Sequence, residues 1–221
     1  MGKERYAISI KSNVKASIGI GAMIVFIAMV LVAGIAASVI IQTATRLEMQ
    51  ALKTGSGTIS EVASGLNVEA IEGNSSTSVL NKMAIEIKPR AGSPDIDLSE
   101  TVVEISDAST KHLLRYSNNG ATGSTSVNGA LFNISNFGSS TTFDIIVLQD
   151  ADNSVSSDTV INFGDHVVIA IDAASIFTTN NGLLPRTDVS GFVISEEGVP
   201  GIIGFTTPCS YTSAKQIVEL Q

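Results

Sequence analysis

The sequence has one cysteine, no tryptophan and few charged side chains, and each shortage excludes a class of protein. A single cysteine, Cys209, excludes intramolecular disulfides. We expect it to be a small buried residue beside the last strand; the alternative is a thiol that links neighbouring subunits. The chain has 13 basic and 21 acidic side chains, a net charge of -8. Because phosphate binding requires clustered basic side chains, this balance argues against nucleic acid as a partner.

The motifs of common enzyme classes are also missing. The chain contains no Gly-x-Ser-x-Gly elbow and no phosphate-binding P-loop. Gly19-Ile20-Gly21 begins like a dinucleotide-binding loop, but Ile24 stands where the third glycine is needed. His112 and His166 are isolated in predicted strands, and we interpret both as structural. We therefore predict that the protein is not an enzyme and carries no cofactor.

The scarcity of charge is greatest near the N-terminus. No charged side chain lies between Lys15 and Arg46. About 20 apolar residues cross a bilayer as a helix, so this stretch is long enough. Residues 1–16 carry four basic side chains against one acidic side chain. This positive flank predicts a cytoplasmic N-terminus, with the rest of the chain outside.

Three interpretations of the apolar stretch compete. A secretory signal has an apolar region of about 7–15 residues, which is shorter than this one. A permanent single-span anchor fits the length, but it does not explain the many small residues, such as Ala33 and Ala37, which stand four positions apart. Small residues let helix backbones approach closely. The third interpretation is a helix that waits in the membrane and then packs among copies of itself.

The segment from Ser17 to Val39 resembles the N-terminus of mature archaellins, the archaeal flagellins. Gly19-Ile20-Gly21 and the run from Ile24 to Met29 carry most of this likeness. The resemblance implies a type IV pilin-like assembly route, in which this helix forms the filament core. The helix residues that we assign to that core are Gly19, Gly21, Phe26, Met29, Ala33 and Ala37.

The resemblance also implies that a dedicated leader peptidase removes residues 1–16. The matching bond joins Ala16 to Ser17, although alanine replaces the usual glycine and only Lys15 is basic immediately before it. Type IV pilins usually carry glutamate at the fifth mature position, where this chain has Gly21. That departure favours an archaellin over a pilin.

Apolar residues continue at spacings of three and four as far as Leu66, which predicts an amphipathic extension of the helix. Gly55 and Gly57 interrupt the pattern, as a bend or a weak place. A helix over residues 17–70 would be roughly 80 Å long at 1.5 Å per residue. The turn-forming cluster from Glu72 to Thr77 then predicts the start of an outer domain over residues 71–221.

The remainder of the chain alternates short apolar runs with turn residues, which predicts an antiparallel β-sandwich. The expected strands are Lys82–Lys88, Thr101–Ser106, His112–Tyr116, Phe143–Gln149, His166–Ile171, Thr187–Ser195, Ile202–Thr206 and Ala214–Leu220. Residues 117–128 read as an exposed mobile loop. Gly164–Asp172, Leu184–Thr187, Phe205–Pro208 and the closing Ile217–Leu220 resemble the immunoglobulin-like outer domain of archaellins. The predicted fold class is therefore α+β, a long hydrophobic helix followed by this sandwich.

Two kinds of polar site remain. From Asp150 to Asp158, oxygen-bearing side chains alternate as in a calcium loop, but Val155 stands where glycine is needed and Ile161 where a bidentate glutamate is needed. We interpret this run as a solvated turn with no metal, and keep Asp150 and Asp152 as weak cation candidates. Asn74 and Asn133 fit the N-glycosylation pattern, and the resemblance implies modification of at least one.

The sequence thus predicts a subunit of the archaellum filament that serves swimming motility. The expected partners are copies of itself, the assembly and motor proteins of the archaellum, a leader peptidase, and the cytoplasmic membrane before assembly at the cell surface. One alternative is an adhesive type IV-like pilus subunit. Another is a single-span anchored surface domain that binds a partner as a monomer.

Overall fold

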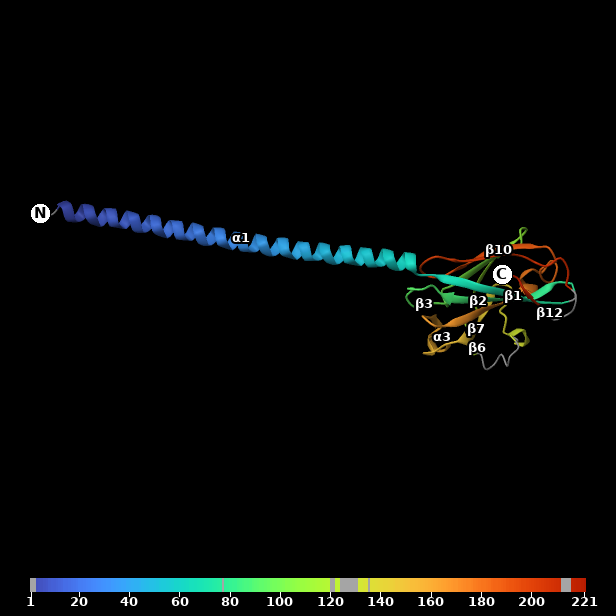
Figure 1. Ribbon diagram of the computed structural model, residues 1–221. Coiled ribbons are helices and arrows are strands. Elements are labelled where there is room, and N and C mark those ends of the chain that lie inside the picture. The colour runs from blue at the N-terminus through green and yellow to red at the C-terminus, as the bar shows by residue number, and fades with distance from the viewer. Residues whose placement is uncertain (1–2, 77, 120–121, 124–130, 135, 212–215) are drawn as a thin grey trace. The chain divides into compact units, whose positions relative to one another are not determined.

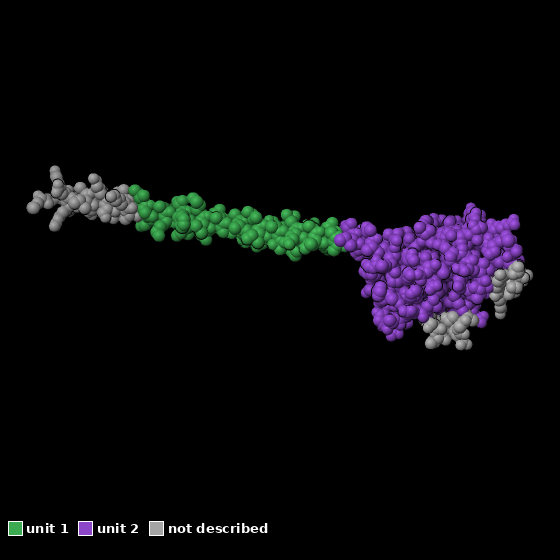
Figure 2. Space-filling view, viewed as in Figure 1, with its two compact units in different colours: residues 1–56 green, residues 57–221 purple. Residues whose placement is uncertain are grey.

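A computed structural model describes residues 3–76, 78–119, 122–123, 131–134, 136–211 and 216–221. The chain divides into two compact units, residues 1–56 and residues 57–221, shown in Figure 2. The first unit is a single helix. The second contains the last residues of that helix and every strand labelled in Figure 1.

The helix α1 (Lys3–Ala63) runs through Gly55 and Gly57 without interruption. It ends seven residues before the predicted end, so the helical prediction for residues 64–70 is wrong. Gly65 adopts a φ of +134°, which stops the helix, and from Leu66 the backbone pairs with a neighbouring strand as β1 (Leu66–Ser75). From Glu72 it pairs with a strand on its other side as well. An extra residue in β1 breaks its period-two alternation, so the sequence pattern did not reveal this strand.

The cluster from Glu72 to Thr77 is likewise not a boundary between helix and sheet. Residues 72–75 are the last four residues of β1, and the turn into β2 (Leu80–Pro89) follows them. The leader boundary at residues 16 and 17 falls inside α1, and removal of the leader stays a prediction.

Among the described residues, the longer strands form two sheets that are linked where β5 pairs with β7. The first sheet has the order β12-β1-β2-β9-β7, and the second has the order β11-β10-β4-β5. The strands of the first sheet are β1 (Leu66–Ser75), β2 (Leu80–Pro89), β7 (Thr142–Gln149), β9 (His166–Asp172) and β12 (Gln216–Glu219). Those of the second are β4 (Val102–Ser106), β5 (Lys111–Tyr116), β10 (Asp188–Ile194) and β11 (Gly201–Thr206).

Neighbouring strands are antiparallel except where β5 pairs with β7 in parallel, at Arg115 with Thr142 and Tyr116 with Phe143. The short strand β6 (Thr122–Gly123) also pairs with β7 in parallel. A separate ladder joins β3 (Ile96–Asp97) to β8 (Val160–Ile161). The connections contain η1 (Leu131–Asn133), α3 (Ser154–Asp158) and α4 (Ala173–Ile176), none of which was predicted.

One hydrophobic core lies between the two sheets. Ile71, Ile85, Ile145 and Ile169 of the first sheet and Val103, Leu114, Val193 and Ile203 of the second are all buried in it. This arrangement confirms the predicted sandwich, and each predicted strand overlaps an observed one. Residues 214–215, and residues 120–121 and 124–128 of the predicted mobile loop, lie outside the described residues.

Candidate assembly surface and polar sites

The middle of α1, from Ile18 to Ile41, is apolar and exposed. Every residue from 17 to 59 is exposed, including large side chains such as Phe26 at 69% and Met29 at 66%. This helix is long and apolar enough to cross a membrane. Because a helix that is apolar all round must be buried all round, its surface requires lipid or other helices.

The small residues predicted for the filament core lie on this same surface. Gly19, Gly21, Ala33 and Ala37 are exposed, and among the described residues no atom comes within 4 Å of a Cβ built at either glycine. These positions are therefore places where another backbone can approach closely.

Two threonine hydroxyls on α1 donate hydrogen bonds to carbonyls of the preceding helical turn, a feature that the sequence analysis missed. Thr43 Oγ1 donates to the carbonyl of Ile40 at 2.9 Å, and Thr45 Oγ1 donates to that of Ile41 at 3.0 Å. Such bonds back to the helix satisfy the hydroxyl without water. The hydroxyls of Thr43 and Thr45 can therefore enter an apolar contact without losing a hydrogen bond.

The start of β1 is held against the β10–β11 connection by close backbone contact. A Cβ at Gly65 would lie 2.3 Å from the carbonyl oxygen of Val199, and one at Gly198 would lie 2.3 Å from that of Ser64. The amide of Val199 donates to Ser64 O at 3.0 Å, and the amide of Arg90 donates to Gly65 O at 3.0 Å. Only glycine fits these two positions, since both also have positive φ.

Asn133, one candidate glycosylation site, is exposed on a loop that the sheet holds down. Lys82 Nζ donates to the carbonyls of Phe132 and Ile134, both at 3.0 Å, on either side of Asn133. The same amine lies 4.4 Å from the centre of the Phe137 ring. Phe132 and Phe137 are buried, so the loop presents Asn133 outward from a fixed base.

The amine that anchors this loop is in an apolar setting. Burial lowers the pKa of Lys82, while the charge of Asp172 opposes that shift.

The other candidate glycosylation site, Asn74, is half-buried in β1 between β2 and β12. Ser135, which completes the acceptor pattern of Asn133, lies outside the described residues.

The weak cation candidates gain a third carboxylate that the sequence analysis missed. Oxygens of Asp150, Asp152 and Asp165 all lie within 4.8 Å of one another. A hydrogen bond from Asn162 and another from the Ser154 amide lower the pKa of Asp152, so that carboxyl favours its charged form. Three converging carboxylates suit a hard divalent cation such as Ca²⁺ or Mg²⁺.

The burial of Asp165 is not expected if this segment is only a solvated turn. Asp152 is exposed, but Asp165 is only 1% exposed. Its Oδ2 accepts from the Asn162 amide at 2.9 Å, whereas its Oδ1 has no hydrogen-bond partner among the described residues. A buried carboxylate oxygen without a donor is costly, and a bound cation would remove that cost.

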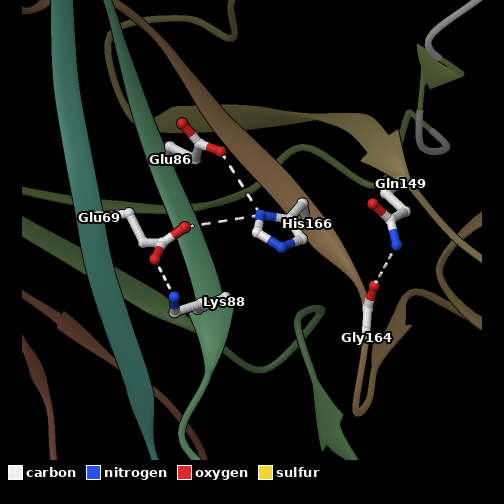
Figure 3. A network of polar contacts seen from close by, with 6 residues as sticks. All are labelled: Glu69, Glu86, Lys88, Gln149, Gly164 and His166. Carbon is white, nitrogen blue, oxygen red and sulfur yellow. Dashed lines mark hydrogen bonds and ion pairs between the residues drawn. The ribbon is translucent and has the colours of Figure 1, made fainter.

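The two histidines have different surroundings, and the cysteine is not where we expected it. His112 packs edge-on against Phe177 at 5.3 Å between ring centres, and its Nε2 lies 3.2 Å from Thr110 Oγ1. His166 lies instead between two glutamates (Figure 3). Cys209 is exposed, so the prediction of a buried thiol is wrong. It follows β11 and points outward between two buried residues, Thr207 and Tyr211.

A single helix with an uncovered apolar surface, joined to a stable sandwich, defines a class of surface proteins that insert in a membrane or assemble through that helix. The model of the archaeal-type flagellin family matches residues 16–205. The chain therefore belongs to the archaeal-type flagellin family, whose members are structural filament proteins. This membership confirms the predicted filament-subunit function.

Similar proteins span nearly the whole chain. Flagellin B2 of Methanocaldococcus jannaschii is 43% identical over 214 residues, which cover 94% of this chain and 95% of that protein. Flagellin B1 of Methanococcus voltae is 41% identical over 215 residues, which cover 95% of this chain and 97% of that protein.

Solved structures agree with this membership. The crystal structure of archaeal flagellin FlaB1 from Methanocaldococcus jannaschii matches with a TM-score of 0.64 at 36% identity, over 72% of this chain and 98% of that chain. The archaeal flagellum of Methanospirillum hungatei matches with a TM-score of 0.57 over 89% of this chain and 98% of that chain. At 14% identity, that second likeness supports the fold alone.

Proposed function

We propose that the chain polymerises through α1 into the core of an archaellum filament at the cell surface. The observation that carries the proposal is the exposed, charge-free apolar stretch of α1 from Ile18 to Ile41. In the precursor this surface lies in the cytoplasmic membrane. After a leader peptidase cuts between Ala16 and Ser17, the helix leaves lipid and packs among like helices.

Small residues supply the preference for helix over lipid. Lipid chains are as apolar as the helix, so burial alone does not drive the transfer. Close approach at Gly19, Gly21, Ala33 and Ala37 adds packing that lipid cannot match. Contacts that repeat without closing into a ring generate a helical filament. The further partners of the subunit are the assembly and motor proteins of the archaellum. The filament serves motility by rotating.

The deciding experiment is N-terminal sequencing of protein recovered from sheared cell-surface material. We expect a chain that begins at Ser17 in a sedimentable fraction. A variant with bulky tryptophan in place of Ala16 should keep its leader and stay in the membrane pellet. Recovery of the wild type only as a membrane-bound chain beginning at Met1 would overturn the proposal and favour the anchored monomer.

We propose in addition that Asn133 carries an N-linked glycan. Its exposure and its anchored loop favour it over Asn74, which is paired in β1. Mass spectrometry of filament peptides should find added mass on the Asn133 peptide, and Asn133→Gln should remove it. An unmodified Asn133 peptide in surface filaments would sink this idea.

A further inference from the structure

Three side chains of metal-binding type converge on the outer face of the first sheet, and none of them belongs to the three-aspartate cluster. His166 Nδ1 of β9 lies 3.6 Å from Glu69 Oε2 of β1 and 3.5 Å from Glu86 Oε1 of β2 (Figure 3). The three side chains are 29–35% exposed. Their donor atoms all lie within 4.8 Å of one another, so one ion can reach all three.

A β-bulge brings Glu69 to this position. Val68 pairs with Ile87 and Ala70 pairs with Glu86, so Glu69 is an extra residue in β1. The bulge breaks the alternation of β1 and directs Glu69 toward Glu86. Bulges that re-aim a side chain in this way are frequent beside functional sites. The bulge is therefore an observation independent of the donor set itself.

The backbone beneath His166 is also fixed. His166 pairs with Gln149 at a second irregularity, this time in β7. Gln149 Nε2 donates to the carbonyl of Gly164 at 3.0 Å and ties down the turn that precedes β9 (Figure 3). A donor set carried by three paired strands is preorganised for an ion.

Charge in the cluster is balanced by one amine only in part. Lys88 pairs with Glu69 through Oε1, which leaves Oε2 facing His166. Two carboxylates and an imidazole then share one small space, an arrangement that a divalent cation stabilises. The shallow pocket lined by Ala70, Ala84, Glu86 and Val168 adjoins the cluster at Glu86, so the site is open to solvent.

We propose that Glu69, Glu86 and His166 form a site for a divalent transition metal of the Zn²⁺ class. An imidazole with two carboxylates suits Zn²⁺, Co²⁺ or Ni²⁺, whereas all-oxygen sites suit Ca²⁺ and Mg²⁺. Three protein ligands leave the fourth tetrahedral position for water or another ligand. The ion joins β1, β2 and β9 and stabilises the folded outer domain.

The test titrates ZnCl2 into the full-length protein in detergent after removal of metals with a chelator. Free Zn²⁺ about 100-fold above its Kd should raise Tm by about 5–10 °C. His166→Ala should weaken Zn²⁺ binding at least about tenfold while its metal-free Tm stays close to that of the wild type. His112→Ala, which removes the other histidine, is the matched control and should bind like the wild type.

Lys88→Met separates a metal site from an ordinary ion-pair network. Removing the amine frees Glu69 and removes a repelling charge, so Zn²⁺ should bind several-fold more tightly. Absence of a Zn²⁺-dependent Tm rise would overturn the proposal. So would a rise that persists in His166→Ala, or one that is lost in His112→Ala or Asp165→Asn, because the ion would then lie elsewhere.

Discussion

At the scale of single residues, two glycines determine how the β-sandwich begins after α1. Gly65 and Gly198 have positive φ, and each leaves no room for a Cβ beside the other segment's backbone. Both are invisible to hydrophobic periodicity, because their role depends on a contact between segments more than 130 residues apart in the sequence. No local pattern could have singled them out from the 19 glycines of the chain.

Gly65→Ala should lower the free energy of unfolding by about 3 kcal/mol or more, since it combines backbone strain with a clash. Thermal or urea unfolding of the full-length protein in detergent measures the loss. Gly204→Ala is the control, because a Cβ there meets nothing within 4 Å among the described residues. Equal stabilities of the two variants would contradict the assigned role of Gly65.

The aspartate cluster gives a second prediction at this scale. Ca²⁺ or Mg²⁺ should raise the Tm of the wild type, because an ion would satisfy the buried oxygen of Asp165. A chelator should reverse the effect, and Asp165→Asn should abolish it. The cation has no role at this cluster if it leaves the Tm of the wild type unchanged, or if it raises the Tm of Asp165→Asn as much as that of the wild type.

At the scale of elements, the turn between β4 and β5 depends on one carboxylate. Asp107 Oδ1 accepts from the amides of Ser109 and Thr110 at 3.0 and 2.7 Å, and from both of their hydroxyls. Burial raises the pKa of Asp107, but these hydrogen bonds outweigh it and leave that pKa below its ordinary value. The charged form therefore stabilises the turn.

Asp107→Asn keeps the shape of the turn and removes the charge, so it should be less stable than the wild type at pH 7. A lowered folded-state pKa means that the stabilisation is present above the unfolded value, about 3.9, and is lost as pH falls through the folded value. The Tm difference between the two proteins should therefore shrink below about pH 4. A difference that is constant from pH 7 to pH 3 would show that the charge is not the cause.

The sequence predicted elements well wherever periodicity is clean. The alternation in Met83-Ala84-Ile85-Glu86-Ile87 identified β2, and the charge-free stretch identified α1. It failed at β1 because the bulge at Glu69 disturbs the alternation. The aspartate pair was found from local spacing, but Asp165 was missed because the fold brings it there from 13 residues beyond Asp152.

At the scale of the whole molecule, assembly and folding depend on different parts of the chain. Ala33→Leu adds bulk where we expect helices to approach closely, so it should reduce the yield of sheared filaments severalfold. It leaves the outer sandwich untouched, so Tm should not change. Ala33→Ser keeps the residue small and should assemble normally. Normal filament yield from Ala33→Leu would place Ala33 away from the helix contacts.

The pairing of β1 with β12 has a consequence for the order of events when the chain is made. β1 follows the helix directly, yet it pairs with the last strand, and Leu220 N donates to Ile71 O at 2.7 Å. At about 5–20 residues per second, the ribosome needs roughly 7 to 30 seconds after β1 to produce β12. During that interval one edge of β1 has no partner, and an open edge is prone to pair with other chains. The apolar helix therefore emerges from the ribosome well before the sandwich can close. Export of the helix can begin before the outer domain folds.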